Sequence, residues 1–151
     1  MATYHKFPAG VQSFEKLRKD GYLYIDKTEL VYNLITTGGP YFLSHPRRFG
    51  KSLLVSTLAA VFEGRRELFD AFTTEAGVEQ PALFIAQTDW KWDRYPVFRF
   101  DFSTGDLYDV AKLDTYIDQT LHKMQAAGAG VTASVWANPP RAEMFILGLP
   151  H

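Results

Sequence analysis

The chain has 151 residues, which is enough for one domain with a sizeable hydrophobic core. Its 16 basic and 17 acidic residues leave a net charge of −1, so the charge indicates neither nucleic acid nor a membrane as a partner. There is no cysteine, which excludes disulfide frameworks, thiolate zinc sites and cysteine nucleophiles. The N-terminus leads into no apolar signal segment, and no run approaches the roughly 18 apolar residues of a membrane span, so we expect a cytoplasmic protein.

Two short helices are predicted before residue 40. The first covers Gln12 to Asp20, where Phe14 and Leu17 share one face. The second begins at Asp26, which forms a capping box with the glutamate three residues later, and it ends at Gly38. We therefore expect Asp26 to cap this helix rather than to act in catalysis.

A strand, a loop and further helices follow. Residues 41–44 predict a short apolar strand, and a helix after the loop ends at Gly64. Its predicted apolar face consists of Leu54, Leu58, Val61 and Phe62. Another short helix is predicted over residues 65–72, residues 73–95 show no clear pattern, residues 96–102 alternate as a strand, and residues 106–126 have helical periodicity.

This order of elements predicts an α/β fold: a partial P-loop NTPase-like parallel sheet flanked by helices. We assign residues 1–125 to this domain. From residue 126 the composition changes to alanine and glycine, and we interpret residues 126–151 as an uncertain tail of a truncated or frame-shifted chain. The exposed strand edges of an incomplete sheet predict a tendency towards self-association.

The most informative segment is residues 45–52, with the sequence H-P-R-R-F-G-K-S. It matches the phosphate-binding pattern G-x-x-x-x-G-K-[ST] except that His45 replaces the first glycine. A turn from strand to helix presents backbone N–H groups and the positive end of the helix dipole to phosphates. In this interpretation Lys51 reaches the β- and γ-phosphate oxygens of a nucleotide, Ser52 places its hydroxyl on Mg²⁺, and Gly50 lets the backbone approach the phosphates.

The other loop residues modify this picture. Pro46 lacks an N–H donor, but the backbone amides from Arg48 through Ser52, including that of Phe49, remain available. Arg47 and Arg48 add two fixed charges that would offset the lost donor by direct contact with phosphate. The alternative interpretation is a solvated basic turn at the start of a helix.

This segment resembles the AAA-ATPase-like family of bacterial and archaeal proteins, in which a P-R-R-F-G-K-S loop replaces the glycine-rich one. The resemblance also includes residues 21–28 and 95–103, and in all it extends over roughly residues 5 to 125. It implies a module that binds ATP with Mg²⁺, in proteins that use hydrolysis to change the conformation of an attached effector. Many similar proteins also contain a PD-(D/E)XK nuclease-like domain, whereas Arg141 to His151 do not resemble the corresponding family region.

Hydrolysis requires a second acidic motif at the end of a hydrophobic strand. Asp101 is the single candidate, but Arg99 interrupts its strand and Phe102 follows it, which favours a surface or capping role. The resemblance places the acidic strand further along than this chain extends. We therefore expect nucleotide binding through a variant Walker A loop with an incomplete catalytic site. The alternative is a non-catalytic fragment or interaction domain with a basic surface loop.

Aromatic residues give weaker signals. Trp90, Trp92 and Tyr95 could stack on bases, but the nearly neutral charge favours packing around a strand entry. Tyr22 and Tyr24 precede the capped helix, at a place where related ATPases contact adenine, and the alternative is ordinary core or edge packing.

Two possible metal-dependent patterns are also weak. Asp70, Asp89 and Lys91 match the D…D-x-K of nucleases by spacing that arises easily by chance. The four histidines show no H-x-x-x-H spacing, so no histidine metal site is predicted.

Overall fold

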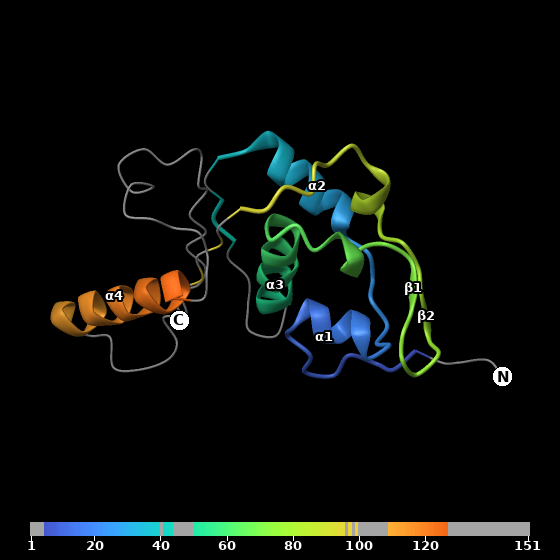
Figure 1. Cartoon of the computed structure of the whole chain (residues 1–151), viewed down its shortest axis with the longest axis horizontal. Coiled ribbons are helices and arrows are strands. Elements are labelled where there is room, and N and C mark those ends of the chain that lie inside the picture. Colours follow the sequence, from blue (N-terminus) through green and yellow to red (C-terminus); the bar gives the residue numbers. More distant parts are fainter. Residues whose placement is uncertain are drawn as a thin grey trace. The chain divides into compact units, whose positions relative to one another are not determined.

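A computed structural model describes residues 5–39, 41–43, 50–95, 97, 99 and 109–126, with the backbone alone for residues 124–126. The chain divides into two compact units, one within Met1–Gly38 and Pro46–Arg94 and the other within Gly39–His45 and Tyr95–His151. Figure 1 shows the elements of each unit. The candidate nucleotide site belongs to the first unit.

The first unit contains three helices, two 3-10 turns and a hairpin. These are α1 (Phe14–Lys19), α2 (Thr28–Thr37), α3 (Lys51–Phe62), η1 (Arg66–Leu68), β1 (Phe72–Thr73), β2 (Glu79–Gln80) and η2 (Phe84–Gln87). The second unit contains α4 (Val110–Ala126). The predicted helices in both units are confirmed, except for the one over residues 65–72, where the structure has the short 3-10 turn η1 and the first residue of β1.

A polar side chain accepts a backbone N–H at the start of each of the two helices before residue 40. The hydroxyl of Ser13 accepts a hydrogen bond from the N–H of Lys16 at the start of α1. The N-cap of α2 is Lys27, without a side-chain capping bond, so the predicted cap at Asp26 is one residue too early. One carboxylate oxygen of Asp26 accepts from the N–H of Thr28 at 2.8 Å. The second oxygen accepts from the N–H of Phe84, so Asp26 also joins α2 to η2.

Helix α3 lies beside α1 and supplies the centre of the core (Figure 1). Its second half is buried from Thr57 through Val61. Leu58 and Val61 of the predicted apolar face are fully enclosed, and Leu54 and Phe62 are half-buried. The predicted apolar face of this helix is therefore the face that packs into the core, and the first turn is the least buried part of the helix.

The sheet differs from the prediction. Strands β1 and β2 pair antiparallel, with Phe72 opposite Gln80. Apart from Phe72, which lies in the predicted helix, both strands fall in residues 73–95, for which the sequence showed no clear pattern. A parallel P-loop sheet is not seen among the described residues, where parallel pairing is limited to an isolated bridge between Lys6 and Tyr22. The coarser prediction, a mixture of helix and sheet, is confirmed.

The two predicted strands are not observed where the structure describes them. Residues 41–43 form no strand and Phe42 is 92% exposed, while Ser44 lies outside the described residues. Of residues 96–102, positions 97 and 99 are described, and neither is in a strand. An apolar run predicts extended backbone, but a strand forms only when a neighbour accepts its hydrogen bonds, and a local pattern contains no information about that neighbour.

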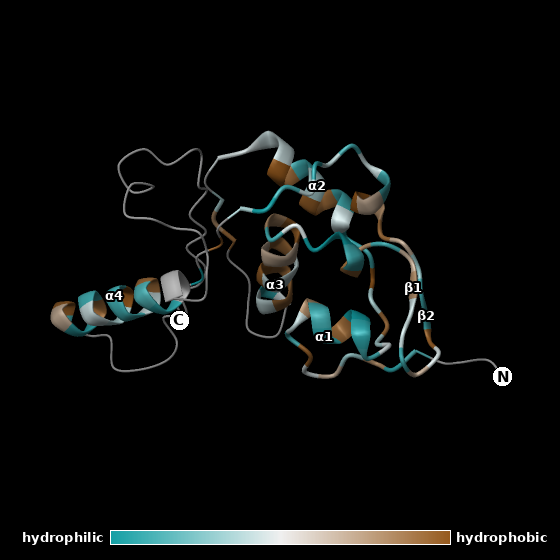
Figure 2. Ribbon diagram, viewed as in Figure 1, coloured by the Kyte–Doolittle hydropathy of each residue, from teal (hydrophilic) through white to brown (hydrophobic). Residues whose placement is uncertain are grey.

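Helix α4 repeats apolar residues along its length (Figure 2). The sequence pattern predicts that Leu107, Val110, Leu113, Ile117 and Leu121 face inward. Leu113, Ile117 and Leu121 are half-buried as predicted, whereas Val110 is 73% exposed and Leu107 lies outside the described residues. Within the described part of the chain, no helix is both long and apolar enough to cross a membrane.

Candidate functional site

The candidate site begins with an unusual backbone conformation at Gly50. This residue is the N-cap of α3 and has φ 80° and ψ 13°, in the left-handed region. A side chain in that region is strained, so the turn requires glycine for its backbone as well as for close approach. A Cβ built on Gly50 would meet none of the described residues within 4 Å.

The first turn of α3 has the features of an anion-binding helix end. Its first intrahelical hydrogen bond runs from Leu54 N–H to the carbonyl of Gly50, at 2.9 Å. The N–H groups at the start of a helix have no acceptor within the helix and carry the positive end of its dipole. The turn contains no acidic residue, and the side chain of Ser52 is exposed. This arrangement fits a phosphate and a hydrated cation.

The other predicted contacts lie outside the described residues. These are Arg47, Arg48 and Phe49 of the loop, together with the candidate metal-site residue Asp101. Their roles remain predictions from the sequence.

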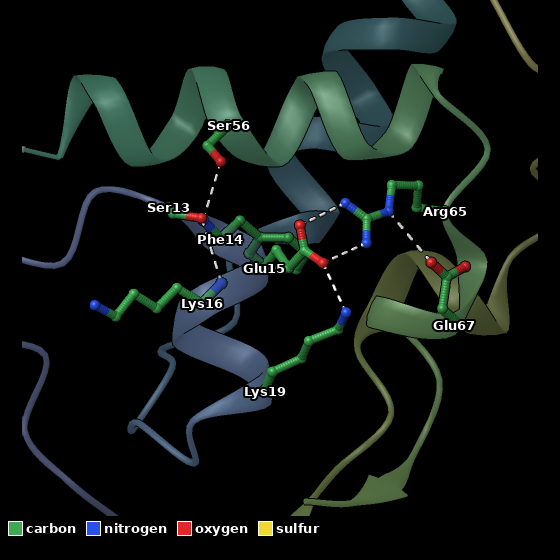
Figure 3. A network of polar contacts seen from close by, with 8 residues as sticks. All are labelled: Ser13, Phe14, Glu15, Lys16, Lys19, Ser56, Arg65 and Glu67. Carbon is green, nitrogen blue, oxygen red and sulfur yellow. Dashed lines mark hydrogen bonds and ion pairs between the residues drawn. The ribbon is translucent and has the colours of Figure 1, made fainter.

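The hydroxyl groups of Ser56 and Thr57 lie one helical turn after the candidate site in the sequence. Ser56 accepts a hydrogen bond from the N–H of Phe14 at 3.0 Å, which joins α3 to the start of α1 (Figure 3). Thr57 donates to the carbonyl of Leu53 at 2.9 Å. Sequence reasoning missed both residues, although Ser56 follows Ser52 by four positions and therefore lies on the same helix face.

The aromatic residues before α2 take packing positions. Tyr24 meets Phe14 edge-to-face at 5.3 Å, and burial raises the pKa of its phenol to about 12. Tyr22 lies under the ammonium group of Lys6, 5.9 Å from the ring centroid, and its carbonyl accepts from Gln80. These contacts show that both tyrosines pack against other residues of the fold.

Trp90 and Trp92 also pack against the core. Trp90 meets Phe62 edge-to-face at 6.1 Å, and Trp92 contacts Phe69 at 5.0 Å. The packing interpretation of the two tryptophans therefore agrees with the structure, while Tyr95 is 43% exposed.

The acidic residues of the nuclease-like spacing have separate partners. Asp70 pairs with Arg66 at 3.3 Å, and Asp89 accepts from the hydroxyl of Tyr32 at 2.5 Å. Nowhere in the described ranges do three histidine or acidic side chains gather in a way that could hold a metal ion.

A buried guanidinium group supports α1 from the other side. Arg18 is fully buried, and burial lowers its pKa to about 10, so the group still carries its charge at neutral pH. Its nitrogens donate to the carbonyls of Leu68, Asp70 and Pro81 and to the side-chain oxygen of Gln80. Sequence reasoning assigned charged residues to the outside of α1, but Arg18 follows Phe14 by four positions and therefore shares its buried face.

An ion-pair network joins the other end of α3 to α1 (Figure 3). Arg65 donates to both carboxylate oxygens of Glu15 at 2.7 Å, and Lys19 adds a third contact at 2.7 Å. These hydrogen bonds lower the pKa of Glu15 to about 2 and raise that of Arg65.

Comparison with known proteins agrees with the resemblance of the loop. A family model described as "Predicted AAA-ATPase" matches residues 8–143. A curated relative, "Uncharacterized protein in vnfD 5'region" of Azotobacter chroococcum mcd 1, is 39% identical over 130 residues. The aligned region is 84% of this chain and 23% of the relative, so the chain spans about a quarter of that protein's length. No solved structure matches. The chain belongs to the AAA-ATPase-like family.

Proposed function

We propose that this chain binds Mg-ATP at the first turn of α3. The observation that carries the proposal is the left-handed Gly50 at the start of α3, followed directly by Lys51 and Ser52. Membership of a predicted ATPase family supports the use of a nucleotide by this turn. When bound, Mg²⁺ would neutralise phosphate charge and bridge phosphate oxygens.

Each residue has a distinct role in the proposal. Lys51 supplies a positive charge to the terminal phosphates, and Ser52 supplies a hydroxyl ligand for the cation. The backbone N–H groups of the turn and the helix dipole add oriented donors. Arg47 and Arg48 add charge from the loop, and the amide of Phe49 adds a donor.

The proposal covers binding and not turnover. Asp101 is the one strand-end acid that the sequence suggests, and its pattern favours a surface role. Because the chain spans 23% of its relative, the effector and any hydrolysis concern the longer proteins of the family. For those proteins we propose that hydrolysis changes the conformation of an attached domain.

A titration of a fluorescent ATP analogue with Mg²⁺ tests the proposal. Lys51→Ala should weaken binding by roughly tenfold or more, because one charge-assisted contact is worth at least about 1.5 kcal/mol. The matched control is Lys27→Ala, which removes an exposed lysine at the start of α2 and should leave the affinity unchanged.

The same titration distinguishes the alternative function. Equal affinity in wild type and Lys51→Ala would contradict the nucleotide site and favour an interaction domain with a basic surface loop. Removal of Mg²⁺ by a chelator should weaken the wild type, and Ser52→Ala should abolish that difference. An Mg²⁺ effect of the same size in Ser52→Ala would reject the role of its hydroxyl.

A further inference from the structure

A hydrogen bond from α1 fixes α3 at a position one helical turn after the candidate site. Phe14 donates its N–H to Ser56, and Ser56 lies one helical turn, about 5.4 Å, beyond Ser52. Because positions four apart share a helix face, α1 contacts α3 on the face that carries Ser52. The bond joins residues 42 positions apart in the sequence, so it fixes two separate elements and not a local turn.

A second contact reaches into the first turn itself. Thr57 is 1% exposed and donates to the carbonyl of Leu53, the residue directly after Ser52. This hydrogen bond lies within α3 and joins its second turn to a carbonyl of the first.

The ring of Phe14 is fully buried and lies 5.3 Å from that of Tyr24, in edge-to-face geometry. We refer to Phe14, Tyr24, Ser56 and Thr57 as the clamp. Within it, Phe14 joins α1 to Ser56 and packs against Tyr24, so α3 cannot rotate or slide against α1 without breaking the Phe14–Ser56 hydrogen bond.

We propose that Ser56 and Thr57 are positioning residues of the nucleotide site, which hold Lys51 and Ser52 in place through the clamp before the nucleotide binds. This inference rests on the proposed function. Apolar packing alone sets no precise rotation of a helix, whereas directional hydrogen bonds do. A turn that is already placed loses less freedom on binding, so preorganisation appears as affinity.

Two substitutions remove the clamp hydroxyls without changing the helix charge. Ser56→Ala and Thr57→Val should each weaken binding of the Mg-ATP analogue by roughly three- to tenfold, the equivalent of one hydrogen bond. Thr57→Ser restores the hydroxyl and should recover most of the affinity. Thr36→Val is the matched control, because Thr36 makes the same bond to a carbonyl four residues earlier, on the exposed side of α2.

Hydrogen exchange provides a readout that does not depend on nucleotide. The clamp variants should speed exchange at the amide of Leu54 in the first turn of α3 and leave that of Ile35 in α2 unchanged. Affinities are measured well below the temperature of the unfolding midpoint of each variant. If the clamp only stabilises the fold, the substitutions should lower that midpoint and leave the affinity unchanged.

The outcomes separate the two proposals. If the wild type binds the analogue and both clamp variants bind it equally well, the positioning role is wrong. If Thr57→Ser fails to recover affinity, the hydroxyl is not the cause. If the wild type binds no analogue, the nucleotide site is wrong, and unchanged exchange at Leu54 would then reject the clamp as well.

Discussion

The two ends of α3 have the same kind of glycine in opposite surroundings. Gly50 before the helix and Gly64 after it both have left-handed backbone, with φ of 80° and 70°. Among the residues that the structure describes, a Cβ on Gly50 would meet no atom within 4 Å, whereas one on Gly64 would lie 2.7 Å from the carbonyl oxygen of Trp92. The N-terminal end is open, and the C-terminal end is packed.

Because of this difference, we expect one end of α3 to stabilise the fold and the other end to bind a ligand. The packed end is followed by Arg65, which pairs with Glu15 of α1, and by the carbonyls that Arg18 contacts. The open end carries Lys51 and Ser52, for which we propose a ligand. Substitutions of the buried groups around the packed end should therefore destabilise the protein, and those at the open end should change binding with little cost in stability.

The largest expected effect is the loss of Arg18. Arg18→Met removes four hydrogen bonds and leaves buried carbonyls without a donor, so the free energy of unfolding should fall by about 3 to 5 kcal/mol. Arg66→Met is the control, since Arg66 is exposed and pairs with Asp70 at the surface, and it should change stability by less than about 1 kcal/mol. Urea unfolding measures both, and similar losses would contradict the buried role of Arg18.

The glycine pair tests the comparison directly. Gly64→Ala combines a left-handed backbone with a close contact to Trp92, so it should destabilise the protein by about 2 to 4 kcal/mol. Gly50→Ala adds the backbone strain alone and should cost about 1 kcal/mol. Thermal unfolding of the two variants measures the difference. Equal losses would show that the two ends of α3 are not packed differently.

The sequence predicted the parts of this fold that depend on neighbouring residues. The Gly38 end of α2 and the buried face of α3 each follow from spacing within one helix, and both are confirmed. The loop also led to the family, because Gly50, Lys51 and Ser52 belong to a continuous motif. Local patterns sufficed where the physical cause was local.

The missed features depend on residues far apart in the sequence. Arg18 is buried because carbonyls 50 and more positions away accept its hydrogen bonds, and composition alone marks arginine as exposed. The hairpin of β1 and β2 has two residues in each strand, too few for a periodic signal. The clamp at Ser56 was hidden for the same reason, since its partner Phe14 lies 42 positions earlier.

The smallest expected effect concerns the ion pair beside the packed end. Arg65 lowers the pKa of Glu15 from 4.5 to about 2, so the pair stabilises the fold above pH 4.5, and this contribution is lost as pH falls through about 2. Because the Glu15 side chain is 40% exposed, solvent reduces the contribution to at most about 1 kcal/mol. Glu15→Gln should therefore lower stability at pH 7 by that amount and match the wild type at pH 2.

Glu67→Gln is the control, because Glu67 is 64% exposed and makes one longer contact of 3.2 Å with Arg65. Urea unfolding between pH 2 and pH 7 measures these differences, and a Glu15→Gln loss that persists at the lowest pH would assign the effect to packing instead of charge.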